Sequence, residues 1–352
     1  MFYIRETTVH RHDPAMNLAV EETLLRACSG EPIFLLWRNR PSVIIGRNQS
    51  AHDEVNLPEA ERRGIPVVRR CTGGGAVFHD LQTLNYSFLV DRSDSDALKP
   101  DLRFFARPIL DAIESLGLPC RFSGRNDLLV DSPDGPMKFS GTASRHFGGR
   151  FLHHGTILFA TDFEPMAALL TPDRGKLRSH AVASVRSRVA NLAPLLPEGL
   201  TIEDFAECLK KQVERSFGGS LCCRDLDDAE VKTACRLREE KYGTAVWNLG
   251  REVAAAREGD LIIRRRRFPW GGVTLTLTLR GGLVERGEIT GDFFAADDPA
   301  LLVAPMIGRP FTPQGLTGVH SATLLKRVFP DLDAGQWRDF LLGNFLLPGE
   351  RG

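Results

Sequence analysis

The most informative stretch of the chain runs over residues 69–80 and reads Arg69-Arg70-Cys71-Thr72-Gly73-Gly74-Gly75-Ala76-Val77-Phe78-His79-Asp80. Three consecutive glycines cost backbone entropy, so they indicate a backbone that takes positive φ or approaches a ligand closely. Bare amides in such a loop can bind anionic oxygens, and two adjacent arginines supply countercharge. A tight turn with two solvated arginines is the alternative. Neither the P-loop pattern nor the dinucleotide fingerprint is present.

Length and charge limit the classes of protein around this loop. The chain has 352 residues, and 45 Lys and Arg balance 45 Asp and Glu, so the formal net charge is zero. The length predicts roughly two domains. A neutral balance argues against a general nucleic-acid binder, which usually carries a basic excess on at least one face. It remains compatible with a local basic pocket.

Targeting signals and disulfides are not expected. No apolar stretch approaches the roughly 18 residues that predict a transmembrane helix. The first residues, Met1–Asp13, lack the basic and apolar regions of a secretory signal and the composition of a transit peptide. The seven cysteines are odd in number, irregularly spaced and without a C-x-x-C pattern. These features predict free thiols in a reducing cytoplasm, without a disulfide framework or a structural zinc site.

The residues before position 120 alternate helical and extended patterns. Asp13-Pro14 predicts a helix start, because an N-cap is followed by proline at the first helical position. We expect the two apolar runs on either side of Asn39-Arg40-Pro41 to form paired strands. The expected elements are strands at Pro32–Trp37, Val43–Arg47, Val67–Arg70 and Leu84–Val90, with helices at Pro58–Arg63 and Phe104–Leu116.

The rest of the chain predicts an α+β organisation in two domains. Ser132–Pro136 has strong turn chemistry and predicts a hairpin. We expect a catalytic domain over residues 1–245, a linker over 246–257 and an accessory domain over 258–352, with a hinge between them at Gly243–Arg257. The expected elements are strands at 127–131, 137–145, 155–160, 261–268, 273–280 and 284–290, with helices at 202–217 (capped by Thr201 or a neighbour), 229–242, 321–328 and 334–346.

Three polar positions after the glycine loop are chemical candidates. Lys138 lies between apolar neighbours, which on a strand would face away from it. Beside a phosphate-binding loop it could neutralise an acyl phosphate; otherwise it is an exposed edge-strand lysine. Asp127 is a candidate Mg²⁺ ligand or a turn cap. His153 and His154 would point to opposite faces of a strand, so a core or hydrogen-bonding role is expected rather than a shared metal.

Taken in order and spacing, the motifs of this chain resemble the lipoate–protein ligase A family along nearly its whole length. Each motif alone is weak, and the arginine–glycine motif occurs in looser form in biotin ligases and in lipoyl and octanoyl transferases. The motifs are Asn17–Glu22, Trp37–Asn39, Val43–Gln49, Arg69–Asp80, Gly124–Leu128, Lys138–Ala143, His153–Thr156, Ser184–Val189 and Trp247–Gly250.

The resemblance implies a fold and a reaction. The fold is α+β, with a large catalytic domain of mixed sheets flanked by helices and a small α+β accessory domain. The reaction activates lipoate with ATP to lipoyl-AMP and transfers the lipoyl group to a lysine. ATP is then a substrate, and Mg²⁺ is the cofactor. Implied partners are lipoate or octanoate and apo lipoyl domains, either of 2-oxoacid dehydrogenase E2 subunits or of the glycine cleavage H protein. Nucleic acid and membrane are not expected partners.

The resemblance also implies roles for individual residues. Lys138 is the implied catalytic residue, bridging the lipoate carboxylate and the α-phosphate, and Asp127 is the candidate Mg²⁺ ligand. The implied nucleotide-binding residues are Arg70, Gly75, Ala76, Val77, Phe78 and Lys138. The implied lipoate-binding residues are Lys138, Gly74 and His79, with Trp37, Val43–Ile45 and Val77 as walls of an apolar slot.

This assignment of Lys138 agrees with the chemistry of the residues. Adenylation brings a carboxylate and a phosphate together, and both are anionic. A fixed ammonium between them offsets their repulsion and stabilises the pentacoordinate transition state. In the second step the same charge would stabilise the tetrahedral oxyanion as the acceptor lysine attacks.

The chain departs from the family pattern at two places. Cys71-Thr72 stands where the family often has two serines, and Gln82-Thr83 stands where it often has Gly-Asn. Adenine contacts are therefore not carried over to Gln82-Thr83.

Two other functions compete with the ligase. A transferase working without ATP could form a thioester on Cys71, whose pKa two arginines would lower; however, the transferases carry their cysteine elsewhere and generally lack a second domain. A relative that consumes preformed lipoyl-AMP is a variant of this alternative. Arg264–Arg267 suggests nucleic-acid binding, but at most half of these side chains can share a strand face. The net charge is zero and no aromatic residues are interleaved, so a solvated edge strand is the simpler explanation, and a surface for an acidic partner such as a lipoyl domain is an intermediate one.

Overall fold

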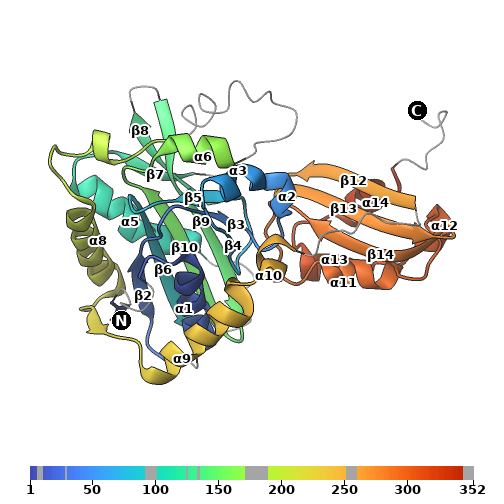
Figure 1. Ribbon diagram of the computed structural model, residues 1–352, viewed down its shortest axis with the longest axis horizontal. Helices are drawn as coiled ribbons and strands as arrows, with labels where there is room; N and C mark the ends of the chain where they lie inside the picture. The colour runs from blue at the N-terminus through green and yellow to red at the C-terminus, as the bar shows by residue number, and fades with distance from the viewer. Residues whose placement is uncertain are drawn as a thin grey trace. The chain divides into compact units, whose positions relative to one another are not determined.

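The chain forms two compact units in a computed structural model that describes residues 1–5, 11–27, 30–91, 101–123, 126–132, 135–170, 189–250 and 260–343. The first unit comprises Met1–Ile45, Ala51–Thr72 and Ala76–Leu249 (Figure 1). The second comprises Gly46–Ser50, Gly73–Gly75 and Gly250–Gly352. Among the described residues, no helix is long and apolar enough to span a membrane.

The first unit is built on an eight-stranded mixed sheet with the strand order β11-β1-β2-β6-β10-β9-β8-β7. Strand β1 pairs in parallel with both of its neighbours, and the remaining pairs are antiparallel. The strands are β1 (Phe2–Ile4), β2 (Ile33–Trp37), β6 (Thr83–Asp91), β7 (Cys120–Ser123), β8 (Asp127–Ser132), β9 (Gly135–Phe147), β10 (Arg150–Leu158) and β11 (Cys222–Arg224).

A smaller sheet of the same unit carries the strands that flank the glycine loop. Its centre is β3 (Ser42–Ile45), which pairs in parallel with β4 (Val67–Arg69) and antiparallel with β5 (Val77–His79). The helices of the unit are α1 (Pro14–Arg26), α2 (Ala51–Glu54), α3 (Leu57–Arg62), α5 (Leu102–Ser115), α6 (Phe163–Leu169), α8 (Ile202–Phe217), α9 (Asp228–Leu237) and α10 (Ala245–Leu249), with a 3₁₀ turn at Ala193–Leu195 and a π-helical turn at Arg238–Tyr242.

Helices cover both faces of the large sheet because its strands are apolar on both sides. Phe34 and Leu36 of β2 join one core with residues of α5 and α8. Leu35 and Trp37, the alternate residues of the same strand, join a second core with α1. Figure 1 shows α5 and α8 on one side of the sheet and α1 on the other. Alternation along an extended strand produces this three-layer arrangement.

Local signals define the two best-marked helices. The Asp13 side chain accepts a hydrogen bond from the Ala15 amide at the start of α1, as expected for an N-cap. Thr201 and Asp204 form a reciprocal capping box at the start of α8. Helix α8 ends at Gly218, whose φ of 69° is left-handed; glycine adopts this conformation at little cost.

The second unit contains an antiparallel sheet of three strands, which correspond to the strands expected at 261–268, 273–280 and 284–290. Leu275 and Leu277 of the central strand are fully buried with Trp337 of the last helix. The elements are β12 (Asp260–Phe268), β13 (Gly271–Arg280), β14 (Leu283–Thr290), α11 (Ala300–Val303), α12 (Pro313–Leu316), α13 (Ala322–Val328) and α14 (Ala334–Leu342), with a 3₁₀ turn at Ala304–Met306.

The prediction that the first two apolar runs pair with each other was wrong. Both form strands, but β2 lies between β1 and β6 in the large sheet, and β3 lies between β4 and β5 in the small one. Both edges of each strand are therefore occupied by sequence-distant partners. Local turn chemistry at 39–41 carries no information about those partners.

Some predicted bounds shifted or fall outside the described residues. Strand β10 begins at Arg150, five residues before the predicted start at Gly155, because it pairs with β6 along its whole length. The predicted helix 229–242 divides into α9 and the π-helical turn. The predicted linker 246–257 contains most of α10, while residues 251–259 lie outside the described part and the linker stays a prediction. Residues 344–346 of the last predicted helix, and Pro133 and Asp134 of the predicted turn, also lie outside it.

Candidate functional site

Arg70 is a buried cation at the start of the glycine loop, with 7% of its surface exposed. Its Nε donates to Thr72 Oγ1 at 3.0 Å, and its Nη1 donates to the Ile44 carbonyl at 3.3 Å. Burial lowers the pKa of Arg70 to about 10, although the Glu21 carboxylate acts in the opposite direction. A guanidinium desolvated in this way would be stabilised by an anionic ligand.

Arg69 has a different environment, which corrects the expectation that both arginines face an anion. Its Nε donates to the Trp247 carbonyl at 2.8 Å, and its Nη2 donates to the Asn248 carbonyl at 3.0 Å. The guanidinium therefore binds the end of α10. Both arginines are equally buried, so it is the engagement of Arg69 with α10 that makes Arg70 the better candidate to contact a bound anion.

A chain of buried hydrogen bonds links the Arg70 side chain through Thr72 and His154 to Glu21. Thr72 Oγ1 bonds His154 Nε2 at 2.8 Å, and His154 Nδ1 bonds Glu21 Oε1 at 2.8 Å. Ser87 donates to the same carboxylate oxygen at 2.6 Å. Glu21 is fully buried, so these bonds to Oε1 compensate part of the desolvation of its carboxylate, while Oε2 has no hydrogen-bond partner among the described residues. Sequence reasoning gave no role to Glu21; its position within the Asn17–Glu22 motif was the signal that could have found it.

The neighbouring histidine lies on the other face of β10, as alternation predicted. The His153 ring stacks on Phe105 with ring centroids 5.2 Å apart, and its Nδ1 bonds Ser144 Oγ at 2.9 Å. Burial lowers the pKa of His153 to about 3. His153 is therefore a neutral core residue, and the two histidines do not converge.

Trp37 and His79 are buried and pack against each other. Their rings meet edge to face with centroids 6.1 Å apart, and His79 Nδ1 bonds Asn39 Nδ2 at 3.0 Å. Burial lowers the pKa of His79 to about 3, and the nearby Arg70 charge acts in the same direction. Among the described residues, His79 Nε2 is buried without a hydrogen-bond partner. A ligand beside this ring could supply one.

Lys138 and Asp127 face each other across β8 and β9. Lys138 Nζ lies 2.8 Å from Asp127 Oδ1, and both side chains are partly exposed. The pairing register shifts between Leu128 and Leu129, so β9 bulges beside Lys138. A Cβ at Gly141 would lie 2.9 Å from the ammonium. Glycine at this position therefore gives the lysine head group its space.

The described residues hold no ready-made metal centre. They contain no group of three His, Cys, Asp or Glu side chains that could bind a metal ion. Asp127 supplies a single carboxylate, which in this structure binds Lys138. Such a ligand suits Mg²⁺ only if phosphate oxygens and water complete the coordination, which is the arrangement that Mg²⁺ usually takes with nucleotides.

Strand β9 connects Lys138 to the glycine loop. Arg145 of the same strand donates through Nη1 to the Cys71 carbonyl at 3.1 Å, while His154 of the paired strand β10 binds Thr72. The start of the loop is thus fixed on the two strands that also carry the lysine. Arg145 was not identified from the sequence, where it follows the Lys138–Ala143 motif without a distinguishing pattern.

The remaining predicted loop residues fall into both units. Gly74 has a φ of 90°, and its amide donates to the Phe293 carbonyl at 3.3 Å within the second unit, to which Gly75 also belongs. Ala76, Val77 and Phe78 belong to the first unit. Phe78 is 2% exposed and packs into a core. A nucleotide contact from Phe78 would therefore use its backbone.

The thioester nucleophile considered from the sequence is excluded by burial. Cys71 is 1% exposed, and desolvation raises the pKa of its thiol to about 11. The sequence predicted the opposite shift from the two adjacent arginines. Their guanidiniums instead bind α10, Thr72 and Ile44, so Cys71 stays protonated and inaccessible.

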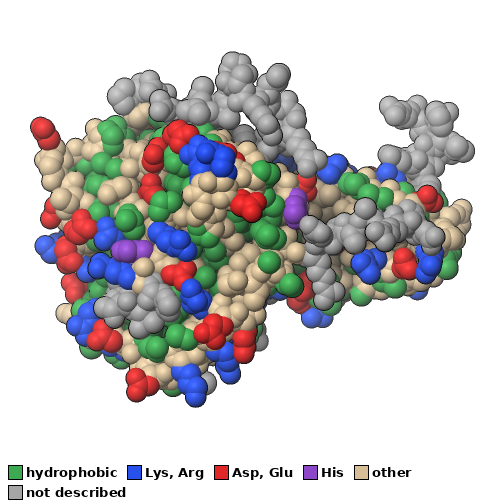
Figure 2. Space-filling model, viewed as in Figure 1, with side chains coloured by type: hydrophobic (Ala, Val, Ile, Leu, Met, Phe, Trp, Pro, Cys, Tyr) green, Lys and Arg blue, Asp and Glu red, His purple; other side chains and the backbone are tan. Residues whose placement is uncertain are grey.

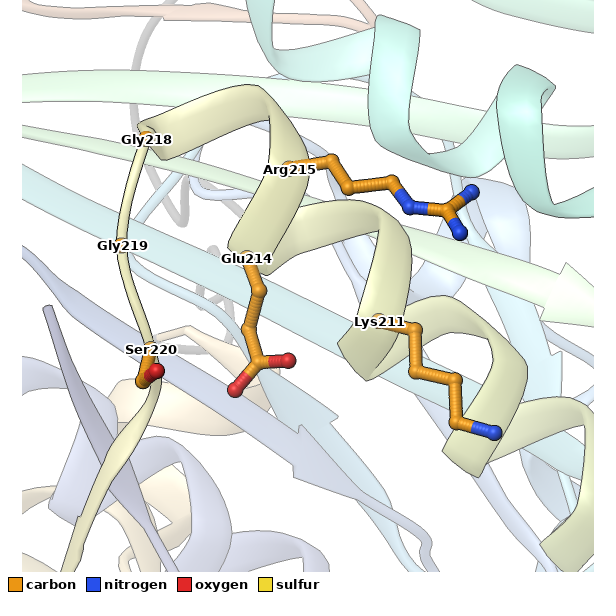
Figure 3. A pocket seen from close by; sticks show the side chains of 6 residues that line it. All are labelled: Lys211, Glu214, Arg215, Gly218, Gly219 and Ser220. Atoms are coloured by element: carbon orange, nitrogen blue, oxygen red, sulfur yellow. The ribbon is translucent and has the colours of Figure 1, made fainter.

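A surface hollow of about 480 Å³ lies elsewhere, where α8 ends. It is lined by Lys211, Glu214, Arg215 and Gly218–Ser220, and Figure 3 shows Glu214 reaching toward the Ser220 segment. The Glu214 carboxylate accepts the Leu221 amide at 2.8 Å. The hollow is open and includes no residue predicted for the site, so it reflects the shape of the helix end.

Two family models match the chain. The model described as the lipoyl protein ligase A/B catalytic domain matches residues 13–214. The model described as the bacterial lipoate protein ligase C-terminus matches residues 262–341.

Curated relatives match over most of the chain. Lipoate-protein ligase LplJ of Bacillus subtilis strain 168 is 32% identical over 332 residues, which cover 94% of this chain and 97% of that protein. Lipoate–protein ligase 1 of Staphylococcus aureus strain Mu50 is 35% identical over 298 residues, which cover 84% and 87%.

Solved structures show the same fold. Lipoate-protein ligase A bound with ATP matches with a TM-score of 0.59 and 29% identity, over 71% of this chain and 98% of that one. An archaeal bi-partite lipoate protein ligase from Thermoplasma acidophilum, described with its E2 lipoyl domain, matches at 0.64 and 30%, over 72% and 98%. LipL1 of P. falciparum, in complex with lipoate, matches at 0.73 over 98% and 99% of the chains; at 22% identity it supports the fold alone.

Proposed function

The chain belongs to the family of lipoate–protein ligases, and from this premise we propose that it works in two ATP-dependent steps around Arg70 and Lys138. In the first step lipoate and ATP form lipoyl-AMP and pyrophosphate. In the second, the lipoyl group passes to a lysine of an apo lipoyl domain. The resemblance found in the sequence is confirmed at the level of the family, the α+β fold and the ligase activity.

The observation that carries the proposal is the buried, desolvated Arg70 guanidinium at the glycine loop. Its lowered pKa marks a cation that the protein interior destabilises. An α-phosphate would restore the lost solvation with charge-assisted hydrogen bonds. The ATP-bound relative supports this assignment, because it places a nucleotide on the same fold.

Lys138 would act on the first chemical step. A carboxylate oxygen of lipoate attacks the α-phosphorus, a new phosphorus–oxygen bond forms, and the bond to pyrophosphate breaks. The ammonium lies between the two anionic groups and stabilises the charge that grows on the phosphate oxygens. For this, Lys138 must exchange its bond with Asp127 for one with substrate.

The second step would use the same charge. The acceptor amine attacks the acyl carbon, a carbon–nitrogen bond forms, the amine loses a proton to solvent, and the bond to AMP breaks. Lys138 stabilises the transient oxyanion. Trp37 and His79 would hold the apolar part of lipoate, and His79 Nε2 is available to a polar atom of the substrate.

Asp127 and a magnesium ion would complete the nucleotide site. Bound Mg²⁺ would neutralise phosphate charge during adenylation. Release of Lys138 toward substrate would leave the Asp127 carboxylate available as its protein ligand. Of the implied acceptors, we propose lipoyl domains of E2 subunits or the glycine cleavage H protein, supported by the archaeal relative that is described with an E2 lipoyl domain. The free described cysteines support a cytoplasmic reaction.

Lipoate-dependent exchange between ATP and pyrophosphate tests the first step, and the mass gain of an apo lipoyl domain tests the second. We expect both with Mg²⁺ present, and Lys138→Ala should lower the exchange rate by about 10²–10³. Lys210→Ala is the matched control, because Lys210 also pairs with a carboxylate, at 2.7 Å from Glu207, and belongs to α8. Normal exchange in Lys138→Ala would refute the role of Lys138. Acyl transfer without ATP would refute the proposed activation step.

A further inference from the structure

The outer edge of β4 is paired with side chains instead of a strand. Strand β4 pairs on one edge with β3, and the Arg70 amide donates to the Ile45 carbonyl at 3.0 Å on that edge. At Arg69 the other edge is closed by α10. The Arg69 amide donates to Asn248 Oδ1 at 2.9 Å, and Trp247 Nε1 donates to the Arg69 carbonyl at 2.8 Å.

The Arg69 side chain also forms hydrogen bonds with α10. Its guanidinium donates to the carbonyls of Trp247 and Asn248, which lie in the last turn of α10. A helix C-terminus leaves carbonyls without intrahelical partners, and a cation there is favourable. Arg69 is 7% exposed and Asn248 is 8% exposed. The contact is therefore reciprocal: side chains of α10 bond the backbone of Arg69, and the side chain of Arg69 bonds the backbone of α10. Arg69 and Asn248 are both buried in it.

Helix α10 is in turn fixed to α1. Asn248 Nδ2 donates to the Tyr242 carbonyl at 2.7 Å, and the Lys241 ammonium lies 4.0 Å from the centroid of the Trp247 ring. Lys241 Nζ and Tyr242 Oη both donate to the Glu22 carboxylate, which is 2% exposed. Lys241 and Tyr242 belong to the π-helical turn, an uncommon element that often occurs at functional sites. The edge of β4 is thus connected through α10 and the π-helical turn to Glu22 of α1.

We propose that Trp247 and Asn248 are positioning residues for the adenylation step. They fix both backbone groups of Arg69, and the next peptide carries Arg70. A twist of β4 at Arg69 would move the Arg70 side chain relative to a bound phosphate without removing any group that touches the ligand. The inference rests on the proposed nucleotide-binding role of Arg70, and it gives the Trp247–Gly250 motif a physical function.

Trp247→Phe is the sharpest test, because it removes the indole N–H while keeping an aromatic ring for Lys241 and Tyr242. We expect the KM for ATP in the exchange reaction to rise about three- to tenfold, the effect of one lost hydrogen bond. The KM for lipoate should stay unchanged. Val246→Ala is the matched control on the same helix, since Val246 is 67% exposed.

A double-mutant cycle with Arg70→Lys separates positioning from a general structural role. If Trp247 acts through Arg70, Trp247→Phe should have little further effect on the KM for ATP once Arg70 is changed. Fully additive effects, or a lowered unfolding temperature with an unchanged KM for ATP, would overturn the inference. If Arg70→Lys alone leaves the KM for ATP unchanged, the proposed role of Arg70 fails, and that result is distinguishable from the failure of Trp247.

Asn248→Ala provides a second measurement. It leaves the Arg69 amide and the Tyr242 carbonyl without their side-chain partner. The full chain should bind ATP about tenfold more weakly by calorimetric titration, while the affinity for lipoate is retained. Should Asn248→Ala not fold, Trp247→Phe decides alone, and equal affinities for ATP in Trp247→Phe and the parent chain would refute the proposal.

Discussion

Arg69 is the last residue of strand β4 in the first unit and Arg70 follows it, whereas Arg264–Arg267 lie along strand β12, at an edge of the sheet in the second. Both arginines of the first run are 7% exposed, and their guanidiniums bind carbonyls and a threonine hydroxyl. In the second run, Arg265 to Arg267 are exposed. Arg267 pairs with Asp292 at 3.0 Å, and Arg266 reaches the Gln336 carbonyl at 3.3 Å.

Both runs consist of arginine, but the first is buried and the second is largely exposed to solvent. A buried guanidinium must be matched by oriented acceptors or by a ligand, so its removal has large effects. An exposed guanidinium is stabilised by water, and its ion pairs contribute little. Figure 2 shows Lys and Arg side chains interspersed with Asp and Glu on the face in view. Charges of both signs are thus mixed on this face, while the proposed site uses one buried cation, Arg70, and one partly exposed cation, Lys138.

The strongest test of this contrast is the loss of a ligand-facing cation. Arg70→Ala should lower lipoate-dependent ATP–pyrophosphate exchange by about 10²–10³, because a preorganised donor to the phosphate is lost. Arg265→Ala should leave the exchange rate unchanged. Comparable rates for the two variants would show that burial does not distinguish the runs functionally.

Arg69→Ala should affect stability more than ligand contact. It leaves the Trp247 and Asn248 carbonyls without a buried donor, at a cost of about 2–4 kcal/mol in the free energy of unfolding. Urea denaturation followed by circular dichroism measures this change. Arg266→Ala, which removes one exposed bond, is the control and should cost less than about 1 kcal/mol. Equal midpoints would contradict the capping role of Arg69.

Burial should act on histidines as it does on arginines. His79 and His153 are buried, and desolvation lowers the pKa of each from 6.5 to about 3. The unfolded chain then binds more protons than the folded chain between pH 6.5 and 3, so stability falls as the pH falls through this range. From pH 7 to 5 the loss should be about 1–2 kcal/mol for each histidine.

His153→Gln isolates one of these contributions. Glutamine does not titrate, so the variant should lose about 1–2 kcal/mol less stability than the parent between pH 7 and 5. Urea titrations at the two pH values provide the measurement. An identical pH dependence in both proteins would mean that His153 takes up its proton in the folded chain as readily as in the unfolded chain, so that burial does not lower its pKa.

The smallest expected effect belongs to the exposed run. Arg265→Ser should change the free energy of unfolding by no more than about 0.5 kcal/mol, because Arg265 is exposed and faces a threonine across the strand pair. The full chain should also show no salt-sensitive binding to a random DNA duplex, whereas binding that weakens steeply with salt would restore the nucleic-acid alternative.

Features encoded locally were predictable from the sequence. The helix caps at Asp13-Pro14 and at Thr201 and the three strands after residue 260 depend on neighbouring residues, and each appears in the structure. The family motifs also marked the glycine loop and Lys138 as candidate site residues, and their roles stay predictions. These signals are short-range, so one sequence contains them in full.

Features that depend on distant partners were not predictable. Arg69 and Asn248 are 179 positions apart, and His154 and Glu21 are 133 apart. The pKa of Cys71 depends on burial, which reversed the direction inferred from its sequence neighbours. Strands β2 and β3 belong to different sheets for the same reason. In each case a tertiary contact decided the outcome, and the sequence showed at most a motif without a role.

The side-chain edge of β4 bears on how the protein can be divided into fragments. A polypeptide that stops at residue 245, the predicted domain boundary, would lack Trp247 and Asn248 and would leave the backbone of Arg69 open to other chains. An open strand edge of this kind promotes self-association. A catalytic fragment intended to stay monomeric should therefore extend through Leu249, and a split version of the ligase should be divided after that residue.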